Sequence, residues 1–138
     1  MAYETIKMEI TSNPEYVSII RLTTSGIANK IGFSIDDIED LKVAISEACT
    51  NAIKHSLEDR FTIIYTIIEN GLTVEIIDNG KGYEVKEVNE PSIDNLDNLK
   101  EGGMGLFIIE ALMDDVVVES KDGQGTSIKM TKYLGVEI

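Results

Sequence analysis

The sequence lacks several features that would assign it to common functional classes. It has no tryptophan and a single cysteine, Cys49, so an intramolecular disulfide is excluded and a reducing compartment is expected. No apolar run approaches the roughly 18 residues of a membrane-spanning helix. The first ten residues also lack the basic start and apolar block of a signal peptide. The sequence therefore predicts a cytoplasmic protein that does not enter a membrane.

Basic residues are also scarce. The chain has 12 Lys and Arg residues against 25 Asp and Glu residues, which gives a net charge of −13. Nucleic-acid binding needs clustered cations to contact phosphates, so a direct nucleic-acid partner is not expected. The acidity leaves two interpretations open, a basic protein partner or simple solubility.

The length of 138 residues fits a single domain spanning residues 1–138. Alternating apolar residues and β-branched runs predict strands at 4–10, 61–68, 72–78, 115–120 and 126–133. Helices are predicted from Pro14 to about Lys30, from Ser34 to near Ser56, and over 106–113, with Gly32 ending the first. The side of the first helix that carries Arg21, Thr23 and Thr24 is predicted to be exposed, either as a contact surface or as an ordinary solvated face.

The second predicted helix carries polar residues at the border of its apolar stripe. Glu47 and Asn51 are four residues apart, so they lie about 40° from each other around the helix axis, one turn apart. Both side chains can therefore act on one ligand. Taken alone, they can also be explained as the solvated side of an amphipathic helix.

Two predicted strands carry a polar residue on a face that is otherwise apolar. By the period of two, Asp78 shares a face with Val74 and Ile76, and Thr126 shares one with Met130. A carboxylate that points toward a buried layer needs a hydrogen-bond donor, and the amino group of adenine is one candidate. A turn-forming aspartate before Asn-Gly is the alternative.

Glycines gather in two segments. One is Asp-Asn-Gly-Lys-Gly at 78–82, and the other is Gly-Gly-Met-Gly at 102–105, directly before a predicted helix. Glycines at a helix start let backbone N–H groups approach a phosphate, although a hinge is an equal alternative. The stretch 83–101 between them has no periodicity, and loops of this length are usually functional lids or disordered. Neither the P-loop nor the dinucleotide-binding glycine pattern is present.

Four segments resemble, in order, the four motifs of the GHKL ATP-binding superfamily: residues 47–55 of the second predicted helix, the two glycine segments, and Gly-Gln-Gly-Thr at 123–126. Within it, the chain is similar to the bacterial anti-sigma factor serine kinases. The similarity rests on PEYVSIIRLT, DDIEDLKVAISEACTNAIKH, EGGMGLFIIEALMDDVVVES and MTKYL. It implies an α/β fold, the two-layer α/β sandwich of the GHKL (Bergerat) type, with a mixed sheet covered on one face by helices and an ATP lid at 83–101.

The resemblance also implies roles for individual residues. Glu47 matches the general base that accepts the serine proton, and Asn51 matches the ligand of Mg²⁺. Asp78 matches the adenine-reading carboxylate, supported by Thr126. The implied ATP contacts are Asn51, Asp78, Gly80, Gly82, Gly103, Gly105 and Thr126. The cation for the γ-phosphate stays open among Lys54, Lys81, Lys86 and Lys100.

The family implies ATP and Mg²⁺ as cofactors, a homodimer and two protein partners. One partner is a stress-response, sigma-B-like sigma factor that is held inactive, and the other is an anti-anti-sigma factor that is phosphorylated on serine. The alternative is an ATP-modulated sigma-binding module without phosphotransfer, but such a module needs no proton acceptor, so Glu47 favours the kinase. A self-contained histidine sensor kinase is excluded, because the single histidine, His55, lies inside the nucleotide motif.

Overall fold

The protein is described by a computed structural model over residues 3–55, 58–78, 104–121 and 125–135. Within these residues the elements are β1 (Glu4–Thr11), the 3-10 helix η1 (Pro14–Tyr16), α1 (Val17–Ile31), α2 (Ile35–His55), β2 (Arg60–Ile68), β3 (Gly71–Asp78), α5 (Met104–Leu112), β4 (Asp115–Lys121) and β5 (Gly125–Tyr133). The predicted lid at 83–101 lies outside the described residues. It stays a prediction, as does the assignment of 1–138 to one domain.

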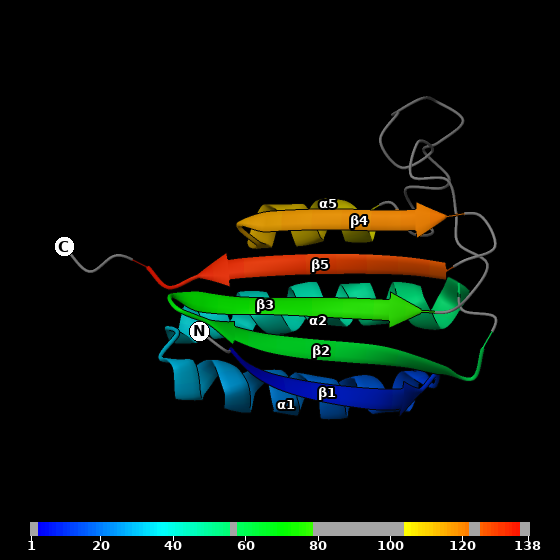
Figure 1. Cartoon of the computed structure of the whole chain (residues 1–138), viewed down its shortest axis with the longest axis horizontal. Coiled ribbons are helices and arrows are strands. Elements are labelled where there is room, and N and C mark those ends of the chain that lie inside the picture. Colours follow the sequence, from blue (N-terminus) through cyan, green and yellow to red (C-terminus); the bar gives the residue numbers. More distant parts are fainter. Residues whose placement is uncertain (1–2, 56–57, 79–103, 122–124, 136–138) are drawn as a thin grey trace.

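The five strands form one sheet in the order β1-β2-β3-β5-β4 (Figure 1). Every neighbouring pair is antiparallel, so the prediction of a mixed sheet is wrong in this respect. The reason is the position of β5. The crossover through α5 makes β4 parallel to β3, but β5 lies between these two strands and is antiparallel to both.

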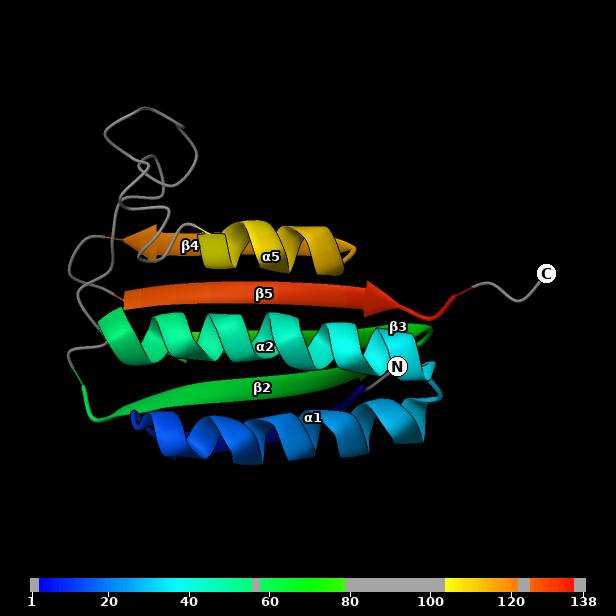
Figure 2. The same ribbon diagram turned by 180° about the vertical axis from the view of Figure 1, so that it is seen from behind.

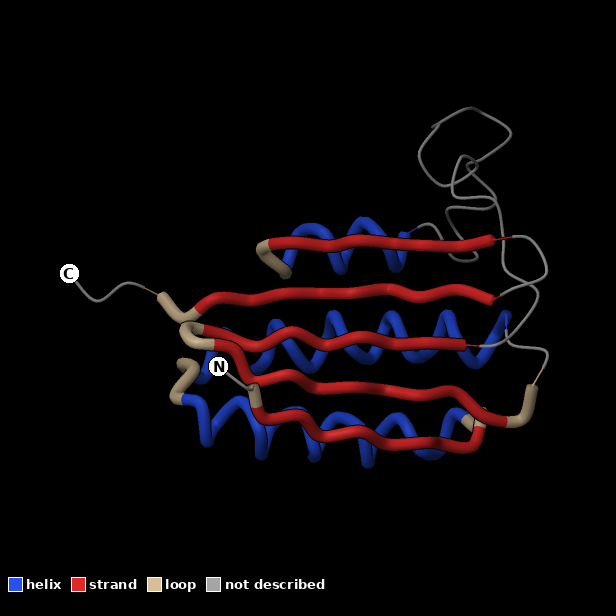
Figure 3. The backbone as a smooth tube through the Cα atoms, in the orientation of Figure 1, coloured by secondary structure: helices blue, strands red, loops and turns tan. Residues whose placement is uncertain are grey.

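The three α-helices of the described residues lie together on one face of the sheet, as expected from the sequence (Figures 2 and 3). The predicted two-layer α/β sandwich is therefore confirmed. α2 lies between α1 and α5, and α2 and α5 run in opposite directions (Figure 2). Apolar side chains of both layers form the core, and its largest fully buried members are Ile20, Leu41, Ile45, Phe61, Ile63, Tyr65, Leu72, Val74, Ile76, Ile109 and Met130.

Capping residues mark the boundaries of the first two helices. The Asn13 side chain accepts a hydrogen bond from the Glu15 amide at the start of η1. Gly32 ends α1 with a φ of 107°, a left-handed conformation that favours glycine. At the start of α2, the Ser34 hydroxyl accepts a hydrogen bond from the Asp37 amide.

Thr24 does not lie on an exposed face of α1, so that prediction is wrong. Its side chain is fully buried, and its hydroxyl lies 2.8 Å from the Ile20 carbonyl and 2.7 Å from the Tyr65 hydroxyl of β2. These contacts satisfy the polar group in the core. Thr24 therefore helps to join α1 to the sheet.

Among the described residues, none of the helices is long and apolar enough to cross a membrane.

Candidate functional site

Glu47 and Asn51 meet the start of α5. Both lie in the C-terminal half of α2 and are partly buried. A methyl group placed on Gly105, the second residue of α5, would lie 3.1 Å from Nδ2 of Asn51 and 3.2 Å from Oε2 of Glu47. Such contacts are tighter than most side-chain packing, so a larger residue at position 105 would displace one of the two polar groups. Glycine thus lets the α5 backbone lie against both.

This arrangement places a carboxylate, an amide and a helix N-terminus at one point. The first turn of an α-helix presents free backbone N–H groups and the positive end of the helix dipole. An anion bound there would lie beside the oxygens of Glu47 and Asn51, which are the type of ligand that Mg²⁺ prefers. The three residues therefore suit a phosphate group accompanied by a hard cation. Mg²⁺ usually keeps several waters and takes phosphate oxygens, so one amide oxygen from the protein fits it.

Asp78 and Thr126 form a second pair. They are direct register partners in the β3–β5 ladder, and each is less than 10% exposed, with 6% for Asp78 and 8% for Thr126. Their neighbours on the same face, Val74, Ile76 and Met130, are buried beneath the helices. The prediction that Asp78 and Thr126 face the helix layer is thus confirmed.

The sequence analysis did not identify Ser120, which lies next to this pair. Ser120 of β4 lies opposite Thr126, with its hydroxyl oxygen 3.1 Å from that of Thr126. Its parity in the strand, shared with Val116 and Val118, would have placed it on the same face. Ser120 therefore orients the threonine hydroxyl within the site.

Both groups lie at the same end of the sandwich. β3 ends, β5 begins, α2 ends and α5 begins at this end (Figures 1 and 2). It is therefore the end to which five of the sequence-predicted site residues map: Glu47, Asn51, Asp78, Gly105 and Thr126. The other three, Gly80, Gly82 and Gly103, lie outside the described residues. So do three of the four candidate lysines, whereas Lys54 is exposed in the last turn of α2.

Cys49 lies on α2 between the two polar residues but belongs to the core. Its side chain is fully buried, and burial raises the pKa of its thiol well above the ordinary value. The thiol therefore stays protonated and unreactive near neutral pH. Its contribution to the site is packing, which holds the helix segment that carries Glu47 and Asn51.

Comparisons with known proteins identify the fold and the family of the chain. The family model of the histidine kinase-like ATPase domain matches residues 10–132. The solved RsbU and RsbW domains of a Mycobacterium tuberculosis protein superpose with a TM-score of 0.71 at 18% identity, over 95% of this chain and 32% of that longer chain. This likeness shows a shared fold.

Curated relatives match at higher identity. The serine-protein kinase RsbW of Bacillus velezensis is 42% identical, over 96% of this chain and 87% of the relative. The RsbW of Oceanobacillus iheyensis is 41% identical, over 98% of this chain and 90% of the relative. The RsbW of Bacillus subtilis is also 41% identical, over 96% of this chain and 87% of the relative. The chain therefore belongs to the histidine kinase-like ATPase family and, within it, to the RsbW serine-protein kinases.

Proposed function

We propose that this chain uses ATP to phosphorylate a serine of an anti-anti-sigma protein. It also binds a sigma-B-like sigma factor and holds it inactive. The observation that carries the kinase assignment is the position of Glu47 and Asn51 beside Gly105 at the start of α5, so close that an added methyl group would be crowded. A purely nucleotide-binding module would need the phosphate site but no carboxylate beside it. Family membership and the resemblance to anti-sigma factor kinases support the choice of substrate and partner.

Each residue has a role in the proposed transfer. The first turn of α5, which contains Gly105, binds the phosphates through backbone N–H groups. Asn51 supplies an oxygen ligand to Mg²⁺, which when bound neutralises charge on the phosphates. Asp78 accepts a hydrogen bond from the adenine amino group, and Thr126 supports it from the neighbouring strand.

Glu47 is the proposed general base. The hydroxyl oxygen of the acceptor serine forms a bond to the γ-phosphorus, while the bond from that phosphorus to the oxygen bridging the β-phosphate breaks. ADP leaves, and the Glu47 carboxylate takes the hydroxyl proton. The position of Glu47, one helical turn from Asn51, keeps the proton acceptor beside the phosphate end of the nucleotide.

Intact-mass spectrometry of an anti-anti-sigma protein incubated with the chain, Mg²⁺ and ATP tests this function. We expect a gain of one phosphoryl group, mapped to serine. Glu47→Gln should slow transfer roughly 10²- to 10⁴-fold while leaving ATP affinity within a small factor. Glu39→Gln is the matched control on the same helix, where the side chain pairs with Lys42 at the surface.

Two outcomes would contradict the proposal. Phosphotransfer at the wild-type rate by Glu47→Gln would show that Glu47 is not the general base. ATP binding without any transfer by the wild-type chain would favour the nucleotide-modulated sigma-binding module instead. In that case the affinity for the sigma factor, measured with ATP and with ADP, should still change with the nucleotide.

The proposed assembly is a cytoplasmic homodimer that binds no nucleic acid directly. Exposed apolar residues on α1 suit protein contacts, since Ile19 is 49% and Leu22 74% exposed. Sedimentation equilibrium should give twice the monomer mass, and a single-copy mass at micromolar concentration would contradict the dimer.

A further inference from the structure

A buried lysine joins two helices at the end of the sandwich opposite the proposed nucleotide site. Lys132 of β5 points to the helix layer, and its side chain is 10% exposed. Its ammonium group donates a hydrogen bond of 2.7 Å to the carbonyl of Leu112, the last residue of α5. The same ammonium lies 3.9 Å from Oδ1 of Asp37, in the first turn of α2.

Both contacts suit the charges at these helix ends. The C-terminus of α5 carries free carbonyl groups and the negative end of its dipole, which favour a cation. The first turn of α2 favours the carboxylate of Asp37 for the opposite reason. Lys132 therefore links the C-terminus of α5 to the N-terminus of α2 through one ammonium group. Unlike apolar packing, these polar contacts depend on the direction between the paired atoms.

The residues on either side of Lys132 hold the same part of the chain. The Asp114 amide, just beyond α5, donates to the Thr131 carbonyl at 2.9 Å. The Asp114 carboxylate accepts from the Tyr133 amide at 2.7 Å. Three consecutive residues of β5 thus fix the C-terminal end of α5 to the sheet, and Lys132 extends this attachment to α2.

The consequence lies at the other end of the same two helices. Because α2 and α5 run in opposite directions, fixing the end of α5 to the start of α2 also sets how far α5 reaches along α2 (Figure 2). The start of α5 then places Gly105 against Glu47 and Asn51, where even a methyl group would be crowded. An axial shift of one residue would move the α5 backbone by about 1.5 Å there.

We propose that Lys132 is a positioning residue for phosphotransfer, which sets the axial position of α5 and thereby the spacing of the phosphate-binding helix start from Glu47 and Asn51. The inference rests on the proposed function of that site. Lys132 itself lies at the opposite end of β5 from Thr126 and takes no part in the chemistry.

The test compares Lys132→Met with two other variants. Methionine keeps the length and apolar stem of lysine but removes the donor and the charge, whereas Lys132→Arg keeps both. Lys129→Met is the matched control, because Lys129 lies on the same strand, on the opposite face, and is exposed. Circular dichroism at the assay temperature establishes that each variant is folded.

We expect folded Lys132→Met to lose roughly 10- to 100-fold in kcat, since displacements near 1 Å at a reacting centre cost about that much. Its affinity for ATP should fall as well. Lys132→Arg should recover most of both quantities, and Lys129→Met should match the wild type. Unchanged kcat and ATP affinity in folded Lys132→Met would show a purely structural role and overturn the proposal.

A second measurement separates positioning from a general loss of stability. Gly105→Ala alone should reduce kcat, because its methyl group crowds Asn51 and Glu47. If Lys132 sets the position of α5, its removal lets the helix shift to accommodate the methyl group. The double variant should then lose less than the product of the two single losses. Fully multiplicative losses would contradict the proposal.

The outcome stays distinguishable from failure of the proposed function. If the wild-type chain binds ATP but transfers nothing, the proposed kinase reaction fails. The ATP affinities of the same variants, measured by calorimetry, still decide whether Lys132 positions α5. In that case, where no kcat can be measured, equal ATP affinities in the wild type and in all of these variants would overturn the inference.

Discussion

Asp78 and Thr126 lie directly opposite each other in the central β3–β5 ladder, with both side chains facing the helices and almost inaccessible to solvent. Neither residue continues the apolar row to which it belongs. A carboxylate and a hydroxyl side by side at the end of a buried row match the donor and acceptor pattern of an adenine edge better than they match a core. The adenine-binding role proposed for this pair leads to the first two predictions.

Replacing the Asp78 carboxylate by an amide should weaken ATP binding. Asp78→Asn keeps the size of the side chain but presents an NH₂ donor where the adenine amino group also donates. Loss of a hydrogen bond to a charged group predicts roughly 10- to 100-fold weaker binding by calorimetry. Glu75→Gln, on the same strand but the opposite face, should bind ATP normally. Equal affinities for the two variants would exclude Asp78 from the adenine site.

Removal of the Thr126 hydroxyl should have a smaller effect in the same direction. Thr126→Val preserves the shape but loses the hydroxyl held 3.1 Å from that of Ser120. About fivefold weaker ATP binding is expected, which corresponds to one neutral hydrogen bond. Thr131→Val removes the hydroxyl 3.2 Å from that of Thr73 on the opposite face, so its ATP affinity should not change. A larger loss in Thr131→Val than in Thr126→Val would count against the assigned face.

The buried contact between Tyr65 and Thr24 should contribute to stability without affecting phosphotransfer. Tyr65→Phe removes the hydroxyl that lies 2.7 Å from Oγ1 of Thr24, while Thr24 keeps its bond to the Ile20 carbonyl. We expect the free energy of unfolding in urea to fall by about 1 kcal/mol. Tyr133→Phe, at an exposed tyrosine, should change it by less than about 0.5 kcal/mol. Reduced kcat in folded Tyr65→Phe would reveal an unexpected link to the site.

Cys49 should resist alkylation in the native protein. Burial both raises the pKa of the thiol and blocks access to it, and only the thiolate reacts. In the unfolded chain the thiol has a pKa near 8.5, whereas the native protein keeps it protonated. This contribution to the free energy of unfolding is therefore fully present below about pH 8.5 and is lost progressively as the pH rises above it. Iodoacetamide at pH 8 should label native protein only as fast as it unfolds, but label the urea-denatured chain within minutes. Rapid labelling of native protein would show that the α2 segment opens.

Local patterns predicted much of the fold, because they follow from backbone geometry. Alternation along β3 placed Asp78 with Val74 and Ile76, and four-residue spacing placed Glu47 one turn from Asn51. Strand order was a different matter, because no local pattern specifies which strands pair across a long connection. The insertion of β5 between β3 and β4 makes the sheet wholly antiparallel, which the sequence alone did not indicate.

Residue type misled where polar side chains are buried. Thr24 was predicted to be exposed, although it follows Ile20 by four residues and precedes Ile27 by three, a spacing that would have placed it on the buried side of α1. Lys132 similarly shares its strand parity with Met130. The Lys132 ammonium donates to the Leu112 carbonyl of α5, and the Thr24 hydroxyl contacts that of Tyr65 in β2 as well as the Ile20 carbonyl of its own helix. The partners from other elements become visible only once the elements are packed.

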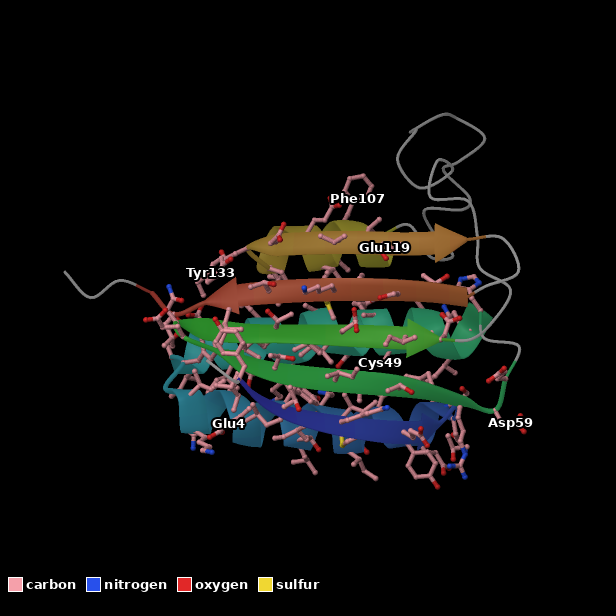
Figure 4. All side chains as sticks on the ribbon, viewed as in Figure 1. Glu4, Cys49, Asp59, Phe107, Glu119 and Tyr133 are labelled. Atoms are coloured by element: carbon pink, nitrogen blue, oxygen red, sulfur yellow. The ribbon has the colours of Figure 1, made fainter. Side chains whose placement is uncertain are left out.

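Position 107 of α5 illustrates a limit on what packing explains. Phe107 is 57% exposed and projects away from the sheet and from the other helices (Figure 4). Its neighbour on the opposite side of the helix, Ile109, is fully buried. No contact among the described residues accounts for an aromatic side chain at this exposed position.

The strand order also has a consequence for the timing of folding during synthesis. β3, which carries Asp78, is made well before β5, which carries Thr126, yet the two are neighbours in the finished sheet. Until β5 emerges from the ribosome, β3 has an open edge, and the C-terminal end of α5 is not yet fixed to the sheet. If the proposed site is correct, a nascent chain should acquire nucleotide affinity in one late step, because β5 brings Thr126 to Asp78 and fixes the end of α5 at the same time.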